Sequence, residues 1–358
     1  MRKVKSPDSI GSIAKYDKSG MLEIIESFPE QCQDAKLIGY EFRLPEGFRT
    51  KYKNIVCAGL GGSAIGADLV RSYTAEELKI PLFVTRNYKL PGFADRDTLV
   101  IISSYSGDTE ETLSAYRDAK TRAAGIVAMT SGGKLSGFAK EDDVPVVNIP
   151  AGLPPRAAFG YSFFPILILL SRMGMIKDQA FFIDDAIKNL RSLKKSRLGR
   201  RVEHKENQAK KIASKLYGKL PVIYASEGHL DAVVTRWRGQ LAENSKTLAS
   251  SHVFPEMSHN EIVGWENPKP VLKESAVIML RDRADHPRIS KRMNIVKKML
   301  AKKKIDVIEV RSTGKELLGR IFSLVYIADF VSFYLAMFNK VDPMPVESIT
   351  YLKKELVK

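Results

Sequence analysis

Cysteine is scarce in this chain, which has only Cys32 and Cys57 among its 358 residues. Two cysteines build neither a disulfide framework nor a metal-ligand pair, so the disulfide-rich secreted class is excluded and a reducing compartment is favoured. The first residues, 1–4, also lack the apolar core of a signal peptide. We therefore expect an intracellular chain, located in the cytoplasm.

Long hydrophobic runs are equally rare. One run, residues 321–338, reaches the length of about 18 residues at which a membrane span becomes conceivable. Asp329 lies near its middle, and the sequence offers no second comparable run, whereas a charge at that depth in a membrane is costly. This pattern favours a helix buried between domains, and we expect no membrane partner.

Positive charge is abundant, with 57 Lys and Arg residues against 41 acidic ones, a net charge of +16. Such a balance suits a polyanion, and it equally suits a small anionic substrate that is attracted by the field of the protein. The basic residues are scattered, with modest clusters at 194–201 and 297–304 that helical periodicity assigns to solvated faces. Zinc-finger spacing, aromatic stacking motifs and a basic tail are missing, so we expect no nucleic-acid partner.

Apolar strands alternate with helical patterns along most of the chain, which predicts an α/β fold with two doubly wound parallel sheets in tandem. We expect an amino-terminal helical segment at 1–50, including one helix that Pro29 ends, a first domain at 51–180, and a second domain at 181–358. The second domain begins with a linker helix over 185–215 and ends in helices. The strands are expected at 55–58, 82–85, 99–103, 125–130, 144–149, 221–226, 247–254, 276–281 and 307–311.

The stretch 100–113 organises the first domain, because an apolar strand breaks there into hydroxyls and one glycine before a helix begins. Ser104, Ser106 and Thr109 offer hydroxyls, and Gly107 permits close backbone approach. The following helix adds unpaired N–H groups and a positive dipole end, which together predict an anion cradle. An ordinary strand-to-helix turn capped by hydroxyls fits this single stretch about as well.

A second loop of the same kind follows the strand at 55–58 and contains Gly59, Gly61, Gly62 and Ser63. The glycine spacing resembles a dinucleotide fingerprint, but the end of the next strand, 84–87, carries no acidic residue to hold a ribose, so NAD is disfavoured. Two such loops after successive parallel strands meet at the carboxyl edge of a sheet, where a monophosphate fits between them.

The turn after the fourth strand holds Ser131 and Gly132, which fit ligand contact and a loop without chemistry about equally well. Three further clusters contain residues suited to chemistry. Arg156 follows two stiffening prolines and suits an oxyanion, although a lone arginine more often lies in a surface loop. Glu243 ends a predicted helix, where a solvated glutamate is the common outcome. His259 lies between a strand and an aromatic anchor and could simply cap a helix.

The chain resembles the bifunctional phosphoglucose/phosphomannose isomerase family, which is built from two sugar isomerase (SIS) domains. The resemblance covers nearly the full length and is specific as a combination, although each motif alone is weak. The matching stretches are 59–66, 104–109, 155–156, 243–244 and 258–262.

This resemblance implies a sugar-phosphate cradle made of Gly61, Gly62, Ser63, Ser104, Ser106 and Thr109. It further implies that Glu243 moves a proton between C1 and C2, that Arg156 stabilises a cis-enediolate, and that Lys353 aids ring opening. His259 resembles a ring-opening histidine that comes from the neighbouring subunit, which implies a homodimer. Met344 stands where relatives often carry threonine, so activity on mannose 6-phosphate is less firmly implied than activity on glucose 6-phosphate.

We therefore expect an aldose–ketose isomerase that interconverts glucose 6-phosphate, with mannose 6-phosphate as a second aldose, and fructose 6-phosphate in glycolysis or gluconeogenesis. Carboxylate, imidazole and guanidinium are the groups that this proton transfer requires, and we expect no cofactor and no metal. Two alternatives remain: a non-catalytic regulator that binds sugar phosphates, and another phosphosugar isomerase on the same scaffold.

Overall fold

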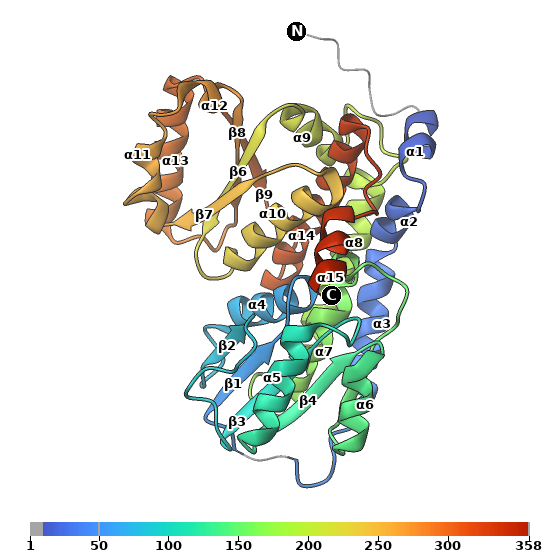
Figure 1. Ribbon diagram of the computed structural model, residues 1–358. Helices are drawn as coiled ribbons and strands as arrows, with labels where there is room; N and C mark the ends of the chain where they lie inside the picture. The colour runs from blue at the N-terminus through green and yellow to red at the C-terminus, as the bar shows by residue number, and fades with distance from the viewer. Residues whose placement is uncertain (1–9, 49–50, 357–358) are drawn as a thin grey trace. The chain divides into compact units, whose positions relative to one another are not determined.

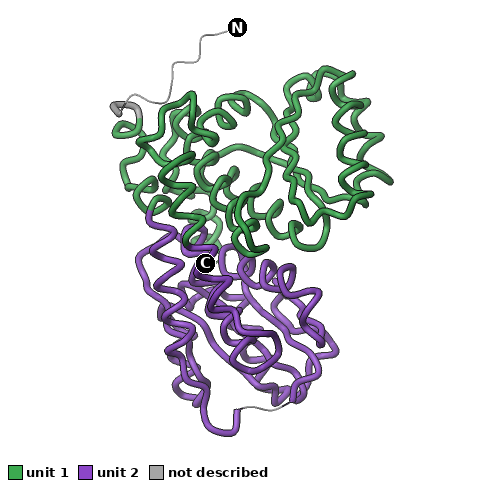
Figure 2. Tube along the Cα trace, turned by 180° about the vertical axis from the view of Figure 1, so that it is seen from behind, with its two compact units in different colours: residues 1–26, 188–358 green, residues 27–187 purple. Residues whose placement is uncertain are grey.

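The computed structural model describes residues 10–48 and 51–356, in which two compact units are distinguished (Figure 2). Unit 1 comprises residues 1–26 and 188–358, and unit 2 comprises residues 27–187. The chain thus divides after 26 and 187, whereas the sequence analysis placed the boundaries at 50 and 180. Residues 1–4, on which the expectation about a signal peptide rests, lie outside the described residues.

Unit 2 is built on a parallel sheet of five strands in the order β2-β1-β3-β4-β5 (Figure 1). Its strands lie within two residues of the expected positions, and consecutive neighbours pair in parallel throughout. The strands are β1 (Asn54–Ala58), β2 (Leu82–Thr85), β3 (Thr98–Ser103), β4 (Gly125–Thr130) and β5 (Val146–Asn148). The helices are α3 (Phe28–Glu41), α4 (Gly62–Thr74), α5 (Glu110–Thr121), α6 (Gly133–Glu141) and α7 (Phe159–Arg172), with a 3₁₀ turn η1 (Pro155–Ala157). Helix α8 (Ala180–Leu193) begins in unit 2 and ends in unit 1.

The strand order reverses direction at β1, and right-handed crossovers therefore place α4 on one face of this sheet and α5 and α6 on the other. Alternate residues of the strands, such as Val56 and Val100, form a core with Leu113 of α5 and Leu135 of α6. On the opposite side, α4 packs against α7, and α7 packs against α3. The loops after β1 and β3 consequently lie side by side at the carboxyl edge, the usual ligand position in such sheets.

Unit 1 contains a parallel sheet of four strands in the order β7-β6-β8-β9. The strands are β6 (Leu220–Ser226), β7 (Ser250–Phe254), β8 (Ser275–Arg281) and β9 (Asp306–Arg311). The longer helices are α9 (Gln208–Leu216), α10 (Asp231–Ser245), α13 (Pro287–Lys302), α14 (Leu317–Asn339) and α15 (Glu347–Leu356). The short helices are α1 (Ile10–Tyr16), α2 (Met21–Glu26), α11 (Glu261–Gly264) and α12 (Lys269–Lys273), with a 3₁₀ turn η3 (Glu256–Ser258).

Helix α14 is the apolar run that the sequence singled out. It is long and apolar enough to cross a membrane, but all of its most apolar window is buried inside the protein. It packs against α9, α10 and α2, all within unit 1, so the expectation of a helix between domains is wrong. A helix that is apolar on every side is the core of the unit it belongs to.

Two other helix predictions are wrong. The single helix that Pro29 was expected to end is two helices, because Pro29 lies in the first turn of α3, where its missing N–H costs no hydrogen bond. The linker helix expected over 185–215 is interrupted between α8 and α9. A π-helical turn, Lys194–Leu198, follows α8. Helix α9 then starts anew, with the Asn207 side chain accepting a hydrogen bond from the N–H of Lys210.

Candidate functional site

The loops after β1 and β3 of unit 2 hold the predicted cradle residues together. Ser63 lies in the first turn of α4, and its hydroxyl oxygen accepts a hydrogen bond of 3.0 Å from the N–H of Tyr105. Within the second loop, the hydroxyl of Ser104 donates to the hydroxyl of Thr109 at 3.1 Å. Ser63 and Ser104 are buried, whereas Ser106 is exposed. The bond from Tyr105 to Ser63 ties the two loops together, so these hydroxyls lie at the same carboxyl edge of the sheet.

Glycine is required at two points of this arrangement. Gly107 has φ +73°, and a Cβ atom there would lie 1.8 Å from the carbonyl oxygen of Gly132. A Cβ atom on Gly62 would lie 2.4 Å from the carbonyl oxygen of Pro155. Each glycine thus lets one backbone segment lie against another at a distance that any side chain would prevent. The loops are held by backbone contact, which leaves little freedom to their hydroxyls.

The loop after β4 is hydrogen-bonded to the loop after β3 and holds it in place. The hydroxyl of Ser131 donates to the carbonyl oxygen of Tyr105 at 2.6 Å, and the N–H of Lys134 donates to Asp108 Oδ1 at 3.0 Å. The sequence left Ser131 open between ligand contact and a loop without chemistry. Its hydroxyl is used to fix the Tyr105 backbone, which is a supporting role that the serine-rich turn alone did not reveal.

Arg156 lies in η1 and is buried, with 4% of its surface exposed. The close approach of Gly62 to Pro155 places this turn directly against the start of α4, which carries Ser63. A buried guanidinium is a fixed cation with several N–H donors, and it is suited to an anionic oxygen. The two prolines and the contact with Gly62 fix the backbone that carries Arg156.

Glu243 lies near the carboxyl end of α10 in unit 1 and is half-buried. The next turn ends at Lys246, which adopts the left-handed conformation with φ +55°. Its Nζ donates to the carbonyl oxygens of Glu243 at 2.6 Å and Pro343 at 3.1 Å. Lys246 therefore joins the segment that carries Glu243 to the loop that carries Met344, a contact that the sequence did not predict.

The other two predicted residues of unit 1 lie on separate elements. His259 follows η3 and is exposed, with its N–H donating to the carbonyl oxygen of Glu256 at 2.8 Å. Lys353 lies on α15 and is also exposed. Within a single chain, neither side chain is enclosed in the interior of the unit.

A second polar cluster lies at the carboxyl edge of the four-stranded sheet. The Ser226 hydroxyl donates to Asp285 Oδ1 at 2.6 Å, and Arg320 Nε donates to Asp282 Oδ2 at 2.9 Å. His229 Nε2 lies 3.6 Å from Asp282 Oδ1. Burial by itself would raise the pKa of Asp282, but the nearby His229 imidazole and the hydrogen bonds from Arg320 and Ser312 outweigh burial and lower the pKa. Throughout 10–48 and 51–356, no group of three or more His, Cys, Asp or Glu residues is arranged to hold a metal ion.

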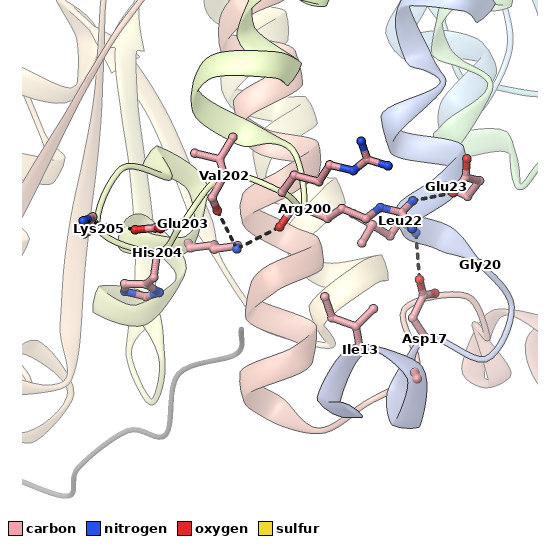
Figure 3. A pocket seen from close by; sticks show the side chains of 13 residues that line it. Ile13, Asp17, Gly20, Leu22, Glu23, Arg200, Val202, Glu203, His204 and Lys205 are labelled. Carbon is pink, nitrogen blue, oxygen red and sulfur yellow. Dashed lines mark hydrogen bonds and ion pairs between the residues drawn. The ribbon is translucent and has the colours of Figure 1, made fainter. Parts of the chain in front are cut away.

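A large cavity in unit 1, of about 990 Å³, contains none of the predicted site residues (Figure 3). It lies between the first two helices and the loop before α9, and its charged groups bind one another. Arg200 Nε donates to Glu26 at 2.6 Å, and Lys210 Nζ donates to the carbonyl oxygen of Val202 at 2.9 Å. Arg200 and Lys210 are therefore already engaged with protein oxygens.

Two parallel α/β units, one with hydroxyl and glycine loops at its carboxyl edge, define the class of SIS-domain phosphosugar proteins. Residues 205–356 match the family of the bacterial phospho-glucose isomerase C-terminal SIS domain. A hypothetical protein from Thermus thermophilus has the same fold, with a TM-score of 0.74 at 15% identity, covering 97% of this chain and 93% of that one.

Sequence relatives identify the family within this class. A bifunctional phosphoglucose/phosphomannose isomerase from Caldicellulosiruptor bescii is 45% identical over 94% of this chain and 98% of its own length. Another, from Aquifex aeolicus, is 38% identical over 86% of this chain and 92% of its own length. The chain belongs to the bifunctional phosphoglucose/phosphomannose isomerase family.

Proposed function

We propose that this protein interconverts glucose 6-phosphate and fructose 6-phosphate, with mannose 6-phosphate as a second aldose. The observation that carries the proposal is the set of hydroxyls that the two linked loops place at the carboxyl edge of unit 2, in a chain whose relatives bear these two activities in their names. Ser63, Ser104, Ser106 and Thr109 bind the substrate phosphate together with the N–H groups at the starts of α4 and α5.

Proton transfer is assigned to Glu243. Aldose–ketose isomerisation removes a proton from C2 of the open aldose, forms an enediolate, and returns the proton to C1, while the hydroxyl proton of O2 passes to O1. A half-buried carboxylate at a helix end can reach a substrate carbon while remaining fixed by its helix. Arg156 stabilises the oxygen anion of the enediolate, a role suited to a buried guanidinium.

Ring opening is assigned to His259 and Lys353, and the working unit is a homodimer. The exposure of His259 in the single chain supports this assignment, because a side chain that serves the neighbouring subunit is exposed in its own. The phosphosugar is the only small-molecule partner that the proposal requires. We place the reaction in the cytoplasm, within glycolysis or gluconeogenesis.

The first experiment compares Glu243→Gln with the wild type, after chelator treatment, on fructose 6-phosphate and mannose 6-phosphate. Loss of the general base should lower kcat by about 100-fold or more, whereas KM should change little. Glu227→Gln, which changes an exposed carboxylate of the same unit, is the matched control and should retain full activity. If the wild type binds both sugar phosphates and converts neither, the isomerase proposal is wrong and the protein is a sugar-phosphate regulator.

The dimer proposal is tested by mixing two inactive variants, Glu243→Gln and His259→Asn, after dissociation and reassembly. If each site combines Glu243 of one subunit with His259 of the other, mixed dimers contain one intact site. Random reassembly should then restore about a quarter of the wild-type activity, since half of the dimers are mixed and half of their sites are intact. An inactive mixture of properly folded dimers would contradict the shared site.

Activity on glucose 6-phosphate but not on mannose 6-phosphate would make Met344→Thr the next variant to measure.

A further inference from the structure

Helix α10 contacts α14 through a row of buried polar side chains that the proposed chemistry does not use. Nη2 of Arg236 lies 2.8 Å from Asp329 Oδ1 and 3.0 Å from Asp329 Oδ2, and Gln240 Nε2 donates to the same carboxylate. One turn further on, Asn244 Nδ2 donates to the Ser332 hydroxyl at 3.0 Å. We call Arg236, Gln240, Asn244, Asp329 and Ser332 the polar seam; all five are buried and lie in unit 1.

The spacing of the seam shows what it constrains. Arg236, Gln240 and Asn244 follow one another at intervals of four residues and therefore line one face of α10. Glu243 precedes Asn244 by one residue, so it projects about 100° around the helix from it, at the edge of the buried face. Any rotation of α10 about its axis consequently moves the Glu243 carboxylate.

Apolar packing alone does not determine this rotation. All residues from Leu318 to Phe338 of α14 are buried, and most are apolar, so the helix presents a similar surface on every side. Asp329 and Ser332 are polar exceptions on this surface, and each is bonded to α10. A buried ionic or polar contact of this type is best known for fixing the register of packed helices, and it adds little net stability.

We propose that Asp329 is a positioning residue for the reaction: through Arg236 and Gln240 it fixes the rotation of α10 and thereby the position of the Glu243 carboxylate. The inference rests on the proposed function, because it assumes that Glu243 moves the proton. The carboxylate lies about 6 Å from the helix axis, so a rotation of about 10° displaces it by about 1 Å. A misplacement of that size lowers turnover by up to about 100-fold.

The test compares Asp329→Asn with Asp282→Asn. Both variants remove a buried carboxylate that is bonded to an arginine, and both affect α14, since Arg320 of that helix binds Asp282. We expect both to lower the melting temperature. Only Asp329→Asn should lower kcat, by about 10- to 100-fold, with KM for fructose 6-phosphate within about twofold of the wild type.

A third variant separates positioning from stability. Arg236→Met/Gln240→Leu/Asp329→Leu replaces the charged part of the seam by apolar side chains, which restores or raises stability in comparable buried clusters. We expect a melting temperature near that of the wild type together with a kcat that stays low. A triple variant with normal kcat, or equal kcat losses in Asp329→Asn and Asp282→Asn, would overturn the positioning role while leaving the proposed function intact. If Glu243→Gln retains full turnover, both fall.

Discussion

The two sheets of this protein have the same parallel topology around their first strands, yet their carboxyl edges differ in chemistry. At the edge of the five-stranded sheet, the loops after β1 and β3 present hydroxyls held in place by glycine contacts. At the corresponding edge of the four-stranded sheet, Asp285 accepts from Ser226 at the end of β6 and from the N–H of Asp282, and Asp282 is bonded to Arg320. Both loop pairs occupy the position where such folds bind ligands.

The difference shows that topology provides a place for a ligand but does not make a site there. Carboxylates repel a phosphate, and a guanidinium that is bonded to Asp282 is no longer available to one. The second edge therefore stabilises unit 1, whereas the first is proposed to bind the substrate. In the proposed reaction, unit 1 contributes instead through Glu243, which lies at the other end of α10 from that edge.

The largest expected effect comes from Gly107→Ala. The added Cβ atom would overlap the carbonyl oxygen of Gly132, so the loop must move and the hydroxyls with it. We expect kcat/KM for fructose 6-phosphate to fall by about 100-fold or more. Gly228→Ala is the matched control in unit 1, because Gly228 also has a positive φ, +94°, but no atom within 4 Å of the added carbon.

Gly228→Ala should lower stability by about 1–2 kcal/mol through backbone strain and leave kcat/KM unchanged. Steady-state kinetics and thermal unfolding of the two variants measure this contrast. Equal losses of kcat/KM in both would show that the two edges do not differ in function.

A smaller effect is expected from removing one hydroxyl at each edge. Ser104→Ala deletes a proposed hydrogen bond to a charged phosphate, which should raise KM by about tenfold or more. Ser226→Ala deletes the bond to Asp285 and should leave KM unchanged while lowering stability by about 1–2 kcal/mol. The measurement is KM for fructose 6-phosphate in both variants. An increase with Ser226→Ala would contradict the conclusion that only the edge of the five-stranded sheet binds the substrate.

The smallest effect on catalysis is expected from Asp282→Asn, which should change stability alone. Removing one member of a buried pair costs about 3–5 kcal/mol at neutral pH. The pKa of Asp282 is lowered in the folded protein. Its stabilisation is therefore complete above the unfolded pKa of about 3.9 and is lost as the pH falls below that value.

Thermal unfolding of wild type and Asp282→Asn from about pH 7 to about pH 3 tests this sign. The difference in melting temperature should shrink as the solution becomes more acidic. A difference that stays constant across this range would show that the Asp282 charge does not contribute to folding.

Much of the fold was predictable because its signals are local. In unit 2, β1, β3 and β4 are each followed by a helix, and β2, β3 and β4 end in a hydroxyl residue, so β2 and β4 have the predicted bounds. The division of the amino-terminal helices was not predictable, since α2 packs against α14 and α3 against α7, and neither partner is near in sequence. Local patterns do not encode which distant surface a short amphipathic helix will cover.

The candidate site shows the same limit. Each of the two hydroxyl loops is a local pattern that the sequence reveals, whereas the support from Ser131 depends on a contact 26 residues away. Asp329 was considered in the sequence only as an obstacle to a membrane span. Its bonds to Arg236 and Gln240 join segments that lie far apart in the chain, which no pattern within either segment indicates.

The division of the chain also constrains the order in which the protein folds during synthesis. Unit 2 is one continuous segment, so all of its strands are available once residue 187 has emerged from the ribosome. Unit 1 is completed last, because α2 at its start packs against α14 near its end, and the Tyr326 hydroxyl donates to the carbonyl oxygen of Glu26. Until α14 is made, the apolar side chains of Met21, Leu22 and Ile25 lack their final partners. This early segment of the nascent chain is therefore vulnerable to aggregation, and it is the part that a chaperone would protect.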